Sequence, residues 1–342
     1  MRIPTPHGSL DFRLSLLSLL STLDSQMYWG ELISLAVAAL WTMSALAAEV
    51  ATKRMGVMVL NVWRMTLAFL LCAVLLWVTT GQPLPFNAGW QAWGWLLLSG
   101  FVGYFLGDWC LFNSYIVIGS RFGQLFMTLA PAFTAFFAWT MIGQTLSWHA
   151  LLAMFVTIAG IGIAVTDSRG AEEGHPVRLK GVLLGIGAAL GQGLGLVMSK
   201  IGLDHYSANL PTGELNEMAN LLPFGSNLIR CIAGAICYSA WMFIARRTKH
   251  GETRWPTFFG AMKDRVAVRA LVITLLSGPF LGVALSLAAL QFTAAGIAST
   301  IMAMTPVLIL LPSHWIFKQP ITLRAVIGAF ISCIGVSLFF LL

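Results

Sequence analysis

The feature that most constrains this chain is a series of apolar runs, each about 20 residues long, separated by short polar segments. A helix of roughly 20 apolar residues crosses a bilayer core of about 30 Å, and every backbone group inside that core needs a hydrogen-bond partner from the protein. The runs lack the alternation of a membrane barrel. Only 10% of the residues are charged, against about 25% in soluble domains. These features predict an all-α membrane protein.

Ten of the apolar runs are predicted to be transmembrane helices. They cover residues 31–51, 55–78, 92–118, 122–142, 148–166, 181–203, 226–245, 270–292, 297–317 and 321–342. A polar segment that carries both charge signs, glycine and proline separates the fifth run from the sixth, as expected of a linker. The predicted organisation is an N-terminal extension (1–27), a first five-helix repeat (28–166), a linker (167–180) and a second five-helix repeat (181–342).

The two halves share an ungapped repeat, in which Phe105–Ile163 falls on Phe280–Leu338 at a displacement of 175 positions. Glycine and proline positions carry this register, and they fix backbone events rather than fill a lipid-facing surface. The matched markers are Met127 with Met302, Pro131 with Pro306, Gln144 with Gln319, and Gly160 with Gly335. Because five spans per half is an odd number, the two halves enter the membrane from opposite faces. The chain is therefore predicted to be a pair of inverted repeats, with a substrate site near the midplane.

A second repeated pattern places an asparagine and an arginine on one face of a helix in each half. Asn61 and Arg64 match Asn227 and Arg230, and residues three apart lie on the same helix face. An arginine at the centre of a span costs about 2.5–3.5 kcal/mol on insertion scales. The two arginines are interpreted as substrate or gate contacts, with snorkelling or a fixed ion pair as the alternative. The inversion is expected to put them near opposite faces, each serving one gate.

Two acids are candidates for proton coupling. Asp108 is the deepest acid, past the middle of the third span, and an ionisable group at this depth is a functional candidate by default. A neutral or paired aspartate that caps a glycine-rich helix is the alternative. Glu49, near the end of the first span, is expected to pair with Arg64.

Uncharged polar side chains and prolines add further candidates at membrane depth. Amides within a span either line a cavity or form hydrogen bonds between helices, and they are Asn113, Gln124, Gln192 and Gln291. Pro131 and Pro306 are expected to kink the fourth and ninth spans beside the cavity. Glycines at four-residue spacing in the sixth span (187, 191 and 195) are typical of close helix packing.

Enzyme and nucleic-acid functions find no support in the sequence. The chain contains no HExxH, GxSxG or Walker motif and no GxGxxG that opens a helix, so it is predicted not to be an enzyme and to need no cofactor or metal. The net charge of +7 comes from basic residues in short loops, which is typical of orientation signals rather than of nucleic-acid binding.

The pattern resembles the drug/metabolite transporter superfamily, in its ten-helix EamA-type branch. The resemblance lies in the Arg64 and Arg230 positions, the spacing from Gly107 to Pro131 and its repeat, and the closing segments 144–160 and 319–335. It implies a ten-helix bundle with a central cavity that exports or exchanges metabolites, amino acids or drugs. Such relatives commonly carry Gly-Glu where this chain has Gly143-Gln144 and Lys318-Gln319, so a carboxylate role at those positions is not expected here.

The basic residues predict an orientation. The odd-numbered connections carry almost all of them, and the even-numbered connections carry none. The positive-inside rule then puts the 246–269 loop in the cytoplasm and both termini outside the cell (inner) membrane. The resemblance implies the opposite, with the termini inside, and the prediction made here follows the charges.

The function predicted is that of a secondary transporter for small organic solutes, an exporter that works by alternating access, with proton coupling left open. A non-transporting membrane sensor or assembly protein is the first alternative, and a membrane-embedded lipid-modifying enzyme is the second. The expected partners are a small-molecule substrate, the lipid bilayer and, if coupling holds, protons. The chain is expected to act as a monomer or a homodimer.

Overall fold

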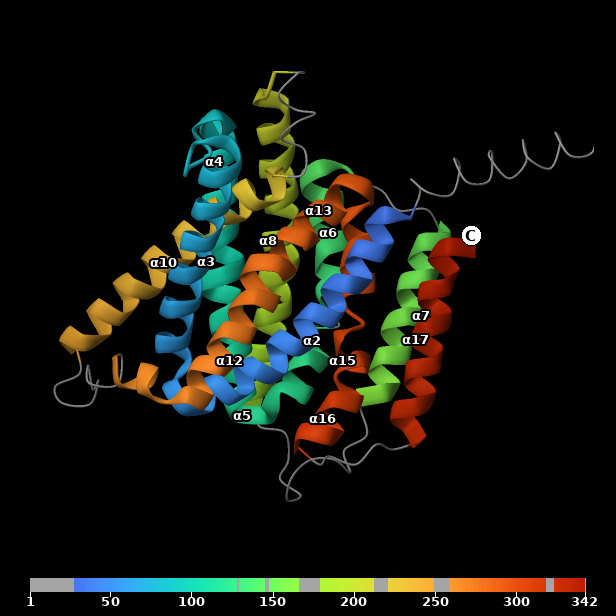
Figure 1. The fold of residues 1–342 in the computed structure, drawn as a ribbon. Coiled ribbons are helices and arrows are strands. Elements are labelled where there is room, and N and C mark those ends of the chain that lie inside the picture. The colour runs from blue at the N-terminus through green and yellow to red at the C-terminus, as the bar shows by residue number, and fades with distance from the viewer. Residues whose placement is uncertain are drawn as a thin grey trace, which may run out of the picture.

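The computed structural model describes residues 28–127, 129–144, 148–165, 179–211, 221–248, 259–317 and 323–341. Throughout these residues every regular element is a helix (Figure 1). The N-terminal extension and nearly all of the linker lie outside the described residues.

The first half begins with two long helices and continues through shorter ones. Its elements are α2 (Trp29–Met55), α3 (Val57–Thr80), the 3-10 turn η1 (Phe86–Ala88), α4 (Gly89–Gly100), the π-helix η2 (Phe101–Gly107), α5 (Asp108–Met127), α6 (Ala130–Ile142) and α7 (Trp148–Val165).

The second half follows the same plan. Its elements are α8 (Leu179–Asn209), α10 (Leu222–Thr248), the 3-10 turn η5 (Ala261–Lys263), α12 (Arg265–Leu275), the π-helix η6 (Leu276–Phe280), α13 (Leu281–Phe292), α14 (Ala295–Met302), α15 (Thr305–Leu308), α16 (Leu310–Phe317) and α17 (Leu323–Leu341). The helices α8 and α10 run a few residues beyond the predicted spans at 181–203 and 226–245.

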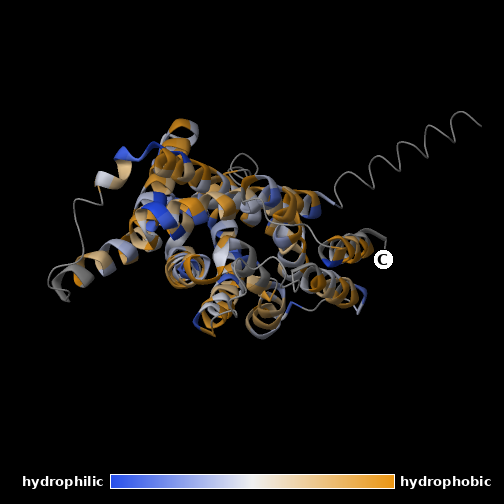
Figure 2. Ribbon diagram, turned by 90° about the horizontal axis from the view of Figure 1, so that it is seen from below, coloured by the Kyte–Doolittle hydropathy of each residue, from blue (hydrophilic) through white to orange (hydrophobic). Residues whose placement is uncertain are grey.

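Seven helical segments among the described residues are long and apolar enough to cross a membrane, and shorter apolar helices accompany them. The third and eighth predicted spans are each one such segment, because η2 and η6 continue α4 and α12 without a break. Seen along the helices, apolar residues predominate over the bundle (Figure 2). The fold is therefore that of an all-helical, multi-pass membrane protein.

Helix boundaries recur at the displacement of 175 that the sequence shows. The π-helices begin at Phe101 and Leu276, and a break follows each third span, at Gly119 in the first half and at Thr293–Ala294 in the second. Gly119 has a φ of 77°, a conformation that glycine adopts without the penalty a side chain would bring. The remaining matched boundaries are the helix ends at Met127 and Met302, the starts at Ala130 and Thr305, and the starts at Trp148 and Leu323.

Contacts between the halves come in matching pairs. The first helix of one half, α2, packs along α12 and α13 of the other, and α8 packs along α4, η2 and α5. The second helices, α3 and α10, pack on each other, and α7 lies alongside α17 (Figure 1). The first helix of each half therefore packs against the third span of the other half.

Small residues allow α8 to approach η2 closely, as their spacing predicts. A methyl group added to Gly191 would lie 2.9 Å from the Cα atom of Gly107, and one added to Gly195 would lie 3.1 Å from that of Gly103. The Ser99 hydroxyl, in the last turn of α4, donates to the carbonyl of Gly195 at 2.8 Å. The glycines of both elements thus bring two backbones together at the interface between the halves.

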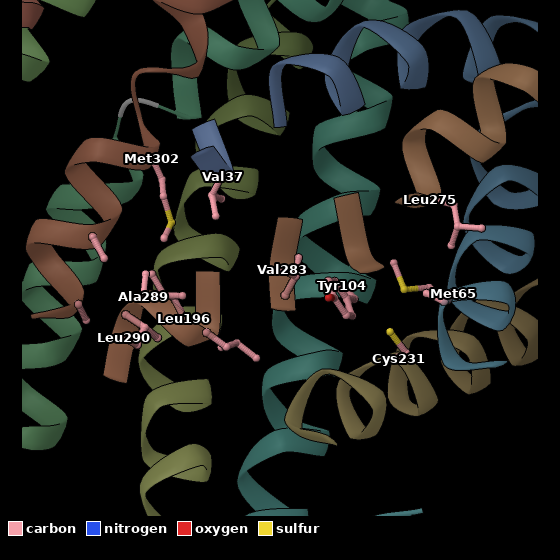
Figure 3. Close-up of a cluster of buried hydrophobic side chains, with 14 of the residues drawn as sticks. Val37, Met65, Tyr104, Leu196, Cys231, Leu275, Val283, Ala289, Leu290 and Met302 are labelled. Carbon is pink, nitrogen blue, oxygen red and sulfur yellow. The ribbon is translucent and has the colours of Figure 1, made fainter. Parts of the chain in front are cut away.

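The main apolar core joins both halves around the two π-helices. It includes Val37, Met65, Tyr104, Cys231 and Val283, all at most 8% exposed. Figure 3 shows Tyr104 between Val283 on one side and Met65 and Cys231 on the other. Tyr104 therefore links this core to the polar groups beside it.

Candidate functional site

A small cavity lies between the halves, with a volume of about 70 Å³. A water molecule needs about 10–15 Å³ on this measure, so the space fits a few waters or one small solute. Helices α2, α3, α5, α8 and both π-helices contribute to its walls. The lining residues are Trp41, Ser44, Ala45, Arg64, Tyr104, Asp108, Leu111, Phe112, Tyr115, Gln124, Met127, Gln192, Gly278, Pro279 and Val283.

Arg64 and Asp108 form an ion pair at the cavity wall. Nη2 of Arg64 donates to Oδ2 of Asp108, and the guanidinium carbon lies 4.6 Å from the centre of the Phe112 ring. Only 4% of Arg64 is exposed, and its Nε has no hydrogen-bond partner. Asp108 is therefore paired in this structure, and its role in proton coupling stays a prediction.

Glu49 does not pair with Arg64, and that prediction is wrong. Its Oε1 accepts from Nζ of Lys53 at 2.6 Å, and its Oε2 accepts from the backbone N–H of Ser120 at 2.9 Å. The positive φ of Gly119 turns the chain so that this N–H, at the start of a helical segment, faces Glu49. Free N–H groups at such a position favour an anion, so Glu49 ties the end of α2 to the turn after the third span.

Arg230 has no such partner. It is 3% exposed, and its guanidinium carbon lies 4.6 Å from the centre of the Tyr104 ring. Within the part of the chain that the structure describes, it forms no ion pair, and its Nε lacks an acceptor. A cation–π contact of this kind contributes up to about 2 kcal/mol when desolvated, but it leaves the charge in place.

The side chains of the two arginines contact neighbouring residues, which the sequence did not lead us to expect. Arg64 lies on α3 and Arg230 on α10, the second helices of the two halves. Both side chains point toward the middle of the third span of the first half, where Arg64 contacts Asp108 and Arg230 contacts Tyr104. The two side chains therefore reach the same stretch of one span, and the assignment of one gate to each arginine stays a prediction.

The two asparagines differ in how they are bonded. Asn227 accepts from the hydroxyl of Tyr104 at 2.5 Å, donates to the carbonyl of Pro279 and lies 3.8 Å from the sulfur of Cys72. Asn61 donates to the carbonyl of Val57 at 3.0 Å, but its Oδ1 is buried without a partner. Neither asparagine lines the cavity.

The amides divide into two groups. Gln124 and Gln192 line the cavity, and Nε2 of Gln124 donates to the hydroxyl of Tyr115 at 2.5 Å. Asn113 turns back onto its own helix, with Nδ2 donating to the carbonyl of Trp109 at 2.7 Å, and Gln291 is exposed on α13. A smaller cavity of about 20 Å³ shares Gln124 and Gln192 with the first.

The two prolines occupy equivalent places. Pro131 and Pro306 each lie in the first turn of a new helix, after an interruption of the span, where the missing N–H costs no hydrogen bond. Pro306 lines the smaller cavity. Among the described residues, no group of three or more His, Cys, Asp or Glu side chains could hold a metal ion.

Sequence reasoning missed the residues that complete the site. Tyr104, Tyr115 and the pair Gly278-Pro279 were not singled out, although each lines the cavity. Two of these positions carried a usable signal, because Tyr104 and Pro279 occupy the same register of the repeat and differ in chemistry. Tyr115 carried none, since a buried tyrosine in an apolar span is ordinary packing.

Comparisons with known proteins give a family and a fold. A sequence model of the EamA-like transporter family matches residues 28–166 and again residues 179–341. A solved structure described only as the crystal structure of a protein superimposes with a TM-score of 0.66 at 16% identity, covering 91% of this chain and 96% of that one. A search of curated proteins finds no match.

Proposed function

The chain belongs to the EamA-like transporter family, and we propose that it is a secondary transporter that exports small organic solutes by alternating access. The observation that carries the proposal is the cavity, which lies between the two repeats and is lined by a buried ion pair, Arg64 with Asp108. Charges this deep in a membrane protein are costly, and they are typical of a substrate or ion pathway.

The proposed architecture is ten transmembrane helices in two inverted five-helix repeats, residues 28–166 and 181–342, joined by the linker 167–180. The matching contacts between halves support it, because α2 packs on the third span of the second half as α8 packs on that of the first. In transporters of this plan, one repeat rocks against the other around a site at the midplane. The cavity lies between the halves, where such a site would be expected.

The π-helices are the proposed points of movement. A π-helical turn interrupts the regular ladder of backbone hydrogen bonds and often occurs at functional sites. Here η2 and η6 occupy the same register, and both supply residues to the cavity wall, Tyr104 from one and Gly278 from the other. A change of twist in either would move cavity residues and leave the long helices straight.

We propose that Arg64 and Asp108 contact the substrate and that Arg230, Asn61 and Asn227 set the shape of the path. Gln124 and Gln192 line the same cavity and would bind polar groups of the solute. Asp108 is the proposed coupling carboxylate if the transport is proton-linked. Glu49 is the weaker coupling candidate, because Lys53 and the Ser120 backbone already hold it.

The proposed location is the cell (inner) membrane, with the 246–269 loop in the cytoplasm and the protein acting as a monomer or a homodimer. The basic residues Lys53, Arg54 and Lys263 support this orientation, since they gather at the end of the bundle where α2 ends and α12 begins (Figure 1). Labelling of single cysteines placed at position 54 and at position 82 would test it. The proposal expects only Gln82→Cys to react with an impermeant reagent added outside intact cells.

The test of transport compares metabolites inside and outside cells that carry the intact protein, no protein, Arg64→Ala or Asp108→Asn. A solute that leaves the cells only with the intact protein supports the proposal and gives the substrate class. If no solute changes in cells, with the protein confirmed in the membrane, and no solute moves in either direction in reconstituted vesicles, export is wrong.

A further inference from the structure

The charges around the cavity do not cancel, and this observation rests on the site proposed above for transport. Arg64 and Arg230 are 4% and 3% exposed, and one carboxylate, that of Asp108, lies with them. Leaving one buried charge without a partner typically costs several kcal/mol. Counted over the residues that the structure describes, the cluster therefore carries one positive charge more than it has carboxylates.

Other acids of the described chain are engaged elsewhere. Glu49 is held by Lys53 and by the Ser120 backbone. Glu31 accepts from the Thr293 hydroxyl at 2.8 Å at the opposite end of α2. Neither is in the cavity wall, so the missing negative charge is not supplied by a described side chain of these helices.

We propose that the cavity binds a small organic anion, a carboxylate, which Arg64 holds in competition with Asp108 and which the charge of Arg230 favours from behind Tyr104. A guanidinium has five N–H donors in a planar fork that matches a carboxylate in two places. Arg64 uses one donor on Asp108, and its Nε is free of any acceptor. Arg64 lines the cavity, so a carboxylate bound there would compete with Asp108 for the fork.

Apolar side chains in the cavity wall would contact the apolar part of the ligand. Trp41, Leu111 and Met127 line the cavity together with the Arg64–Asp108 pair. A volume of about 70 Å³ suits a ligand of a few heavy atoms. A short-chain carboxylate therefore fits the cavity in size, and the charge of Arg230 behind Tyr104 favours it over a cation.

The repeat explains where the uncompensated charge comes from. The position that matches Asp108 in the second half is Val283, which also lines the cavity and is 8% exposed. A carboxylate at Val283 would add a second acid beside the cavity and make the acids equal in number to the arginines in the cluster. Its absence leaves room for an acid that arrives with the ligand.

Binding is tested on the purified protein in detergent, so that the result does not depend on transport. Thermal unfolding is measured with sodium propionate, with propionamide and with propylammonium chloride, each at matched ionic strength against sodium chloride. The proposal expects propionate to raise the midpoint and the amide and the ammonium ion to leave it unchanged. No response to propionate, or an equal response to the ammonium ion, would overturn the proposal.

Two substitutions give opposite signs for an anion site and a cation site. Asp108→Asn removes the competitor of the ligand and should tighten propionate binding by about tenfold, the equivalent of 1.4 kcal/mol. Val283→Asp adds a carboxylate to the cavity and should weaken it by about as much, with Val283→Asn as the uncharged control. Loss of binding in Asp108→Asn with gain in Val283→Asp contradicts an anion site.

Each variant is first checked by size-exclusion chromatography, and Val283→Asp remains informative if Asp108→Asn does not fold. The outcome also separates this proposal from the transport proposal. Propionate binding with the expected signs, but without movement of any solute, would keep the anion site and reject transport. Movement of a cation or a neutral solute, without propionate binding, would keep transport and reject the anion site.

Discussion

The two arginines have equivalent positions in the two halves but different partners. Each arginine follows an asparagine by three residues and lies against a glycine of the other half's π-helix, Gly278 for Arg64 and Gly103 for Arg230. Arg64 has a carboxylate partner and faces the cavity. Arg230 is stacked on Tyr104 and has no ion pair within the described residues. The repeat therefore conserves the backbone and the position of the charge, but not its partner.

Two side-chain exchanges account for the difference. The position of Asp108 is Val283 in the second half, which removes the acid. The position of Tyr104 is taken by Pro279 in the second half, which has no hydroxyl. Oδ1 of Asn227 therefore accepts from Tyr104, whereas Oδ1 of Asn61 has no donor. The asparagine of one half-site is thus satisfied by hydrogen bonds, and the asparagine of the other keeps an unsatisfied oxygen. Duplication followed by such exchanges gives a single asymmetric site in a nearly symmetric frame.

The largest effect is expected from removing the charge of Arg64. Arg64→Gln leaves the buried Asp108 carboxylate without its partner, which typically costs about 3–5 kcal/mol. Arg230→Gln removes a cation that has no carboxylate partner, so it should cost far less or stabilise the protein. The free energy of unfolding, measured by SDS titration in mixed micelles, distinguishes the two variants.

The double variant Arg64→Gln/Asp108→Asn is the control for that comparison. It removes both charges of the pair and should recover most of the stability lost in Arg64→Gln, because no buried charge is left unpaired. Equal losses for Arg64→Gln and Arg230→Gln would mean that the two arginines are equally well compensated, contrary to the structure.

The asparagines should show a smaller contrast in the same direction. Asn227→Leu leaves the hydroxyl of Tyr104 and the carbonyl of Pro279 without their partner, and each buried group left unsatisfied costs about 1–3 kcal/mol. Asn61→Leu removes an oxygen that is already unsatisfied, so the expected change is close to zero. The same unfolding titration measures both.

A milder variant checks that the asparagine contrast comes from hydrogen bonding rather than from packing. Tyr104→Phe keeps the ring over Arg230 and removes only the hydroxyl, leaving Oδ1 of Asn227 with the Cys231 thiol, a weak donor 3.9 Å away. It should lose part of what Asn227→Leu loses. A Tyr104→Phe protein as stable as the wild type would show that the bond to Asn227 contributes nothing.

These contrasts also mark how far the sequence could predict the site. The register of 175, the breaks at Gly119 and before Pro131, and the close approach of Gly191 all follow from residues whose backbone behaviour is local. The partners of the charged groups do not. Glu49 was assigned to Arg64 from sequence proximity, but the turn at Gly119 presents the Ser120 N–H to it instead.

Contacts between the halves were beyond sequence reasoning altogether. The stacking of Arg230 on Tyr104 depends on how α10 crosses η2, and nothing in either segment alone specifies that crossing. The depth of the arginines had a similar problem, because the distance from the end of a span does not say how far a long side chain reaches. The sequence therefore identified residues of the site better than it predicted the contacts between them.

Helix packing beside the two arginines should also differ. A methyl group on Gly100 would lie 2.4 Å from the carbonyl oxygen of Arg230 and 2.8 Å from its Cα atom, both backbone atoms. The matching position is Leu275, a large buried side chain in place of the glycine. Gly100→Ala should therefore displace α10 and cost about 1–3 kcal/mol, as overpacking typically does. Gly94→Ala, on the same helix, has open space and is the control for the titration.

The smallest effect is expected where the first helix of each half meets the start of the other half's third span. Nη1 of Arg54 donates to Oδ2 of Asp264 at 2.8 Å, whereas the matching junction is uncharged, with Asn209 donating to the carbonyl of Ala88 at 2.9 Å. The hydrogen bond from Arg54 lowers the pKa of Asp264 below its usual value, and the backbone N–H groups of Ala267 and Val266 act in the same direction.

The sign of the pH dependence follows from that shift. A carboxylate whose pKa is lowered in the folded state stabilises the fold above its unfolded pKa, and this contribution is lost as the pH falls through the folded pKa. Asp264→Asn should therefore lower the unfolding midpoint slightly at pH 7, and the difference from the wild type should vanish in acid. Asn209→Ala breaks the uncharged junction and should lower the midpoint by the same amount at every pH. If the Asp264→Asn difference were also constant from pH 7 to acid, the charge on Asp264 would contribute nothing, and the two junctions would be equivalent in spite of their different chemistry.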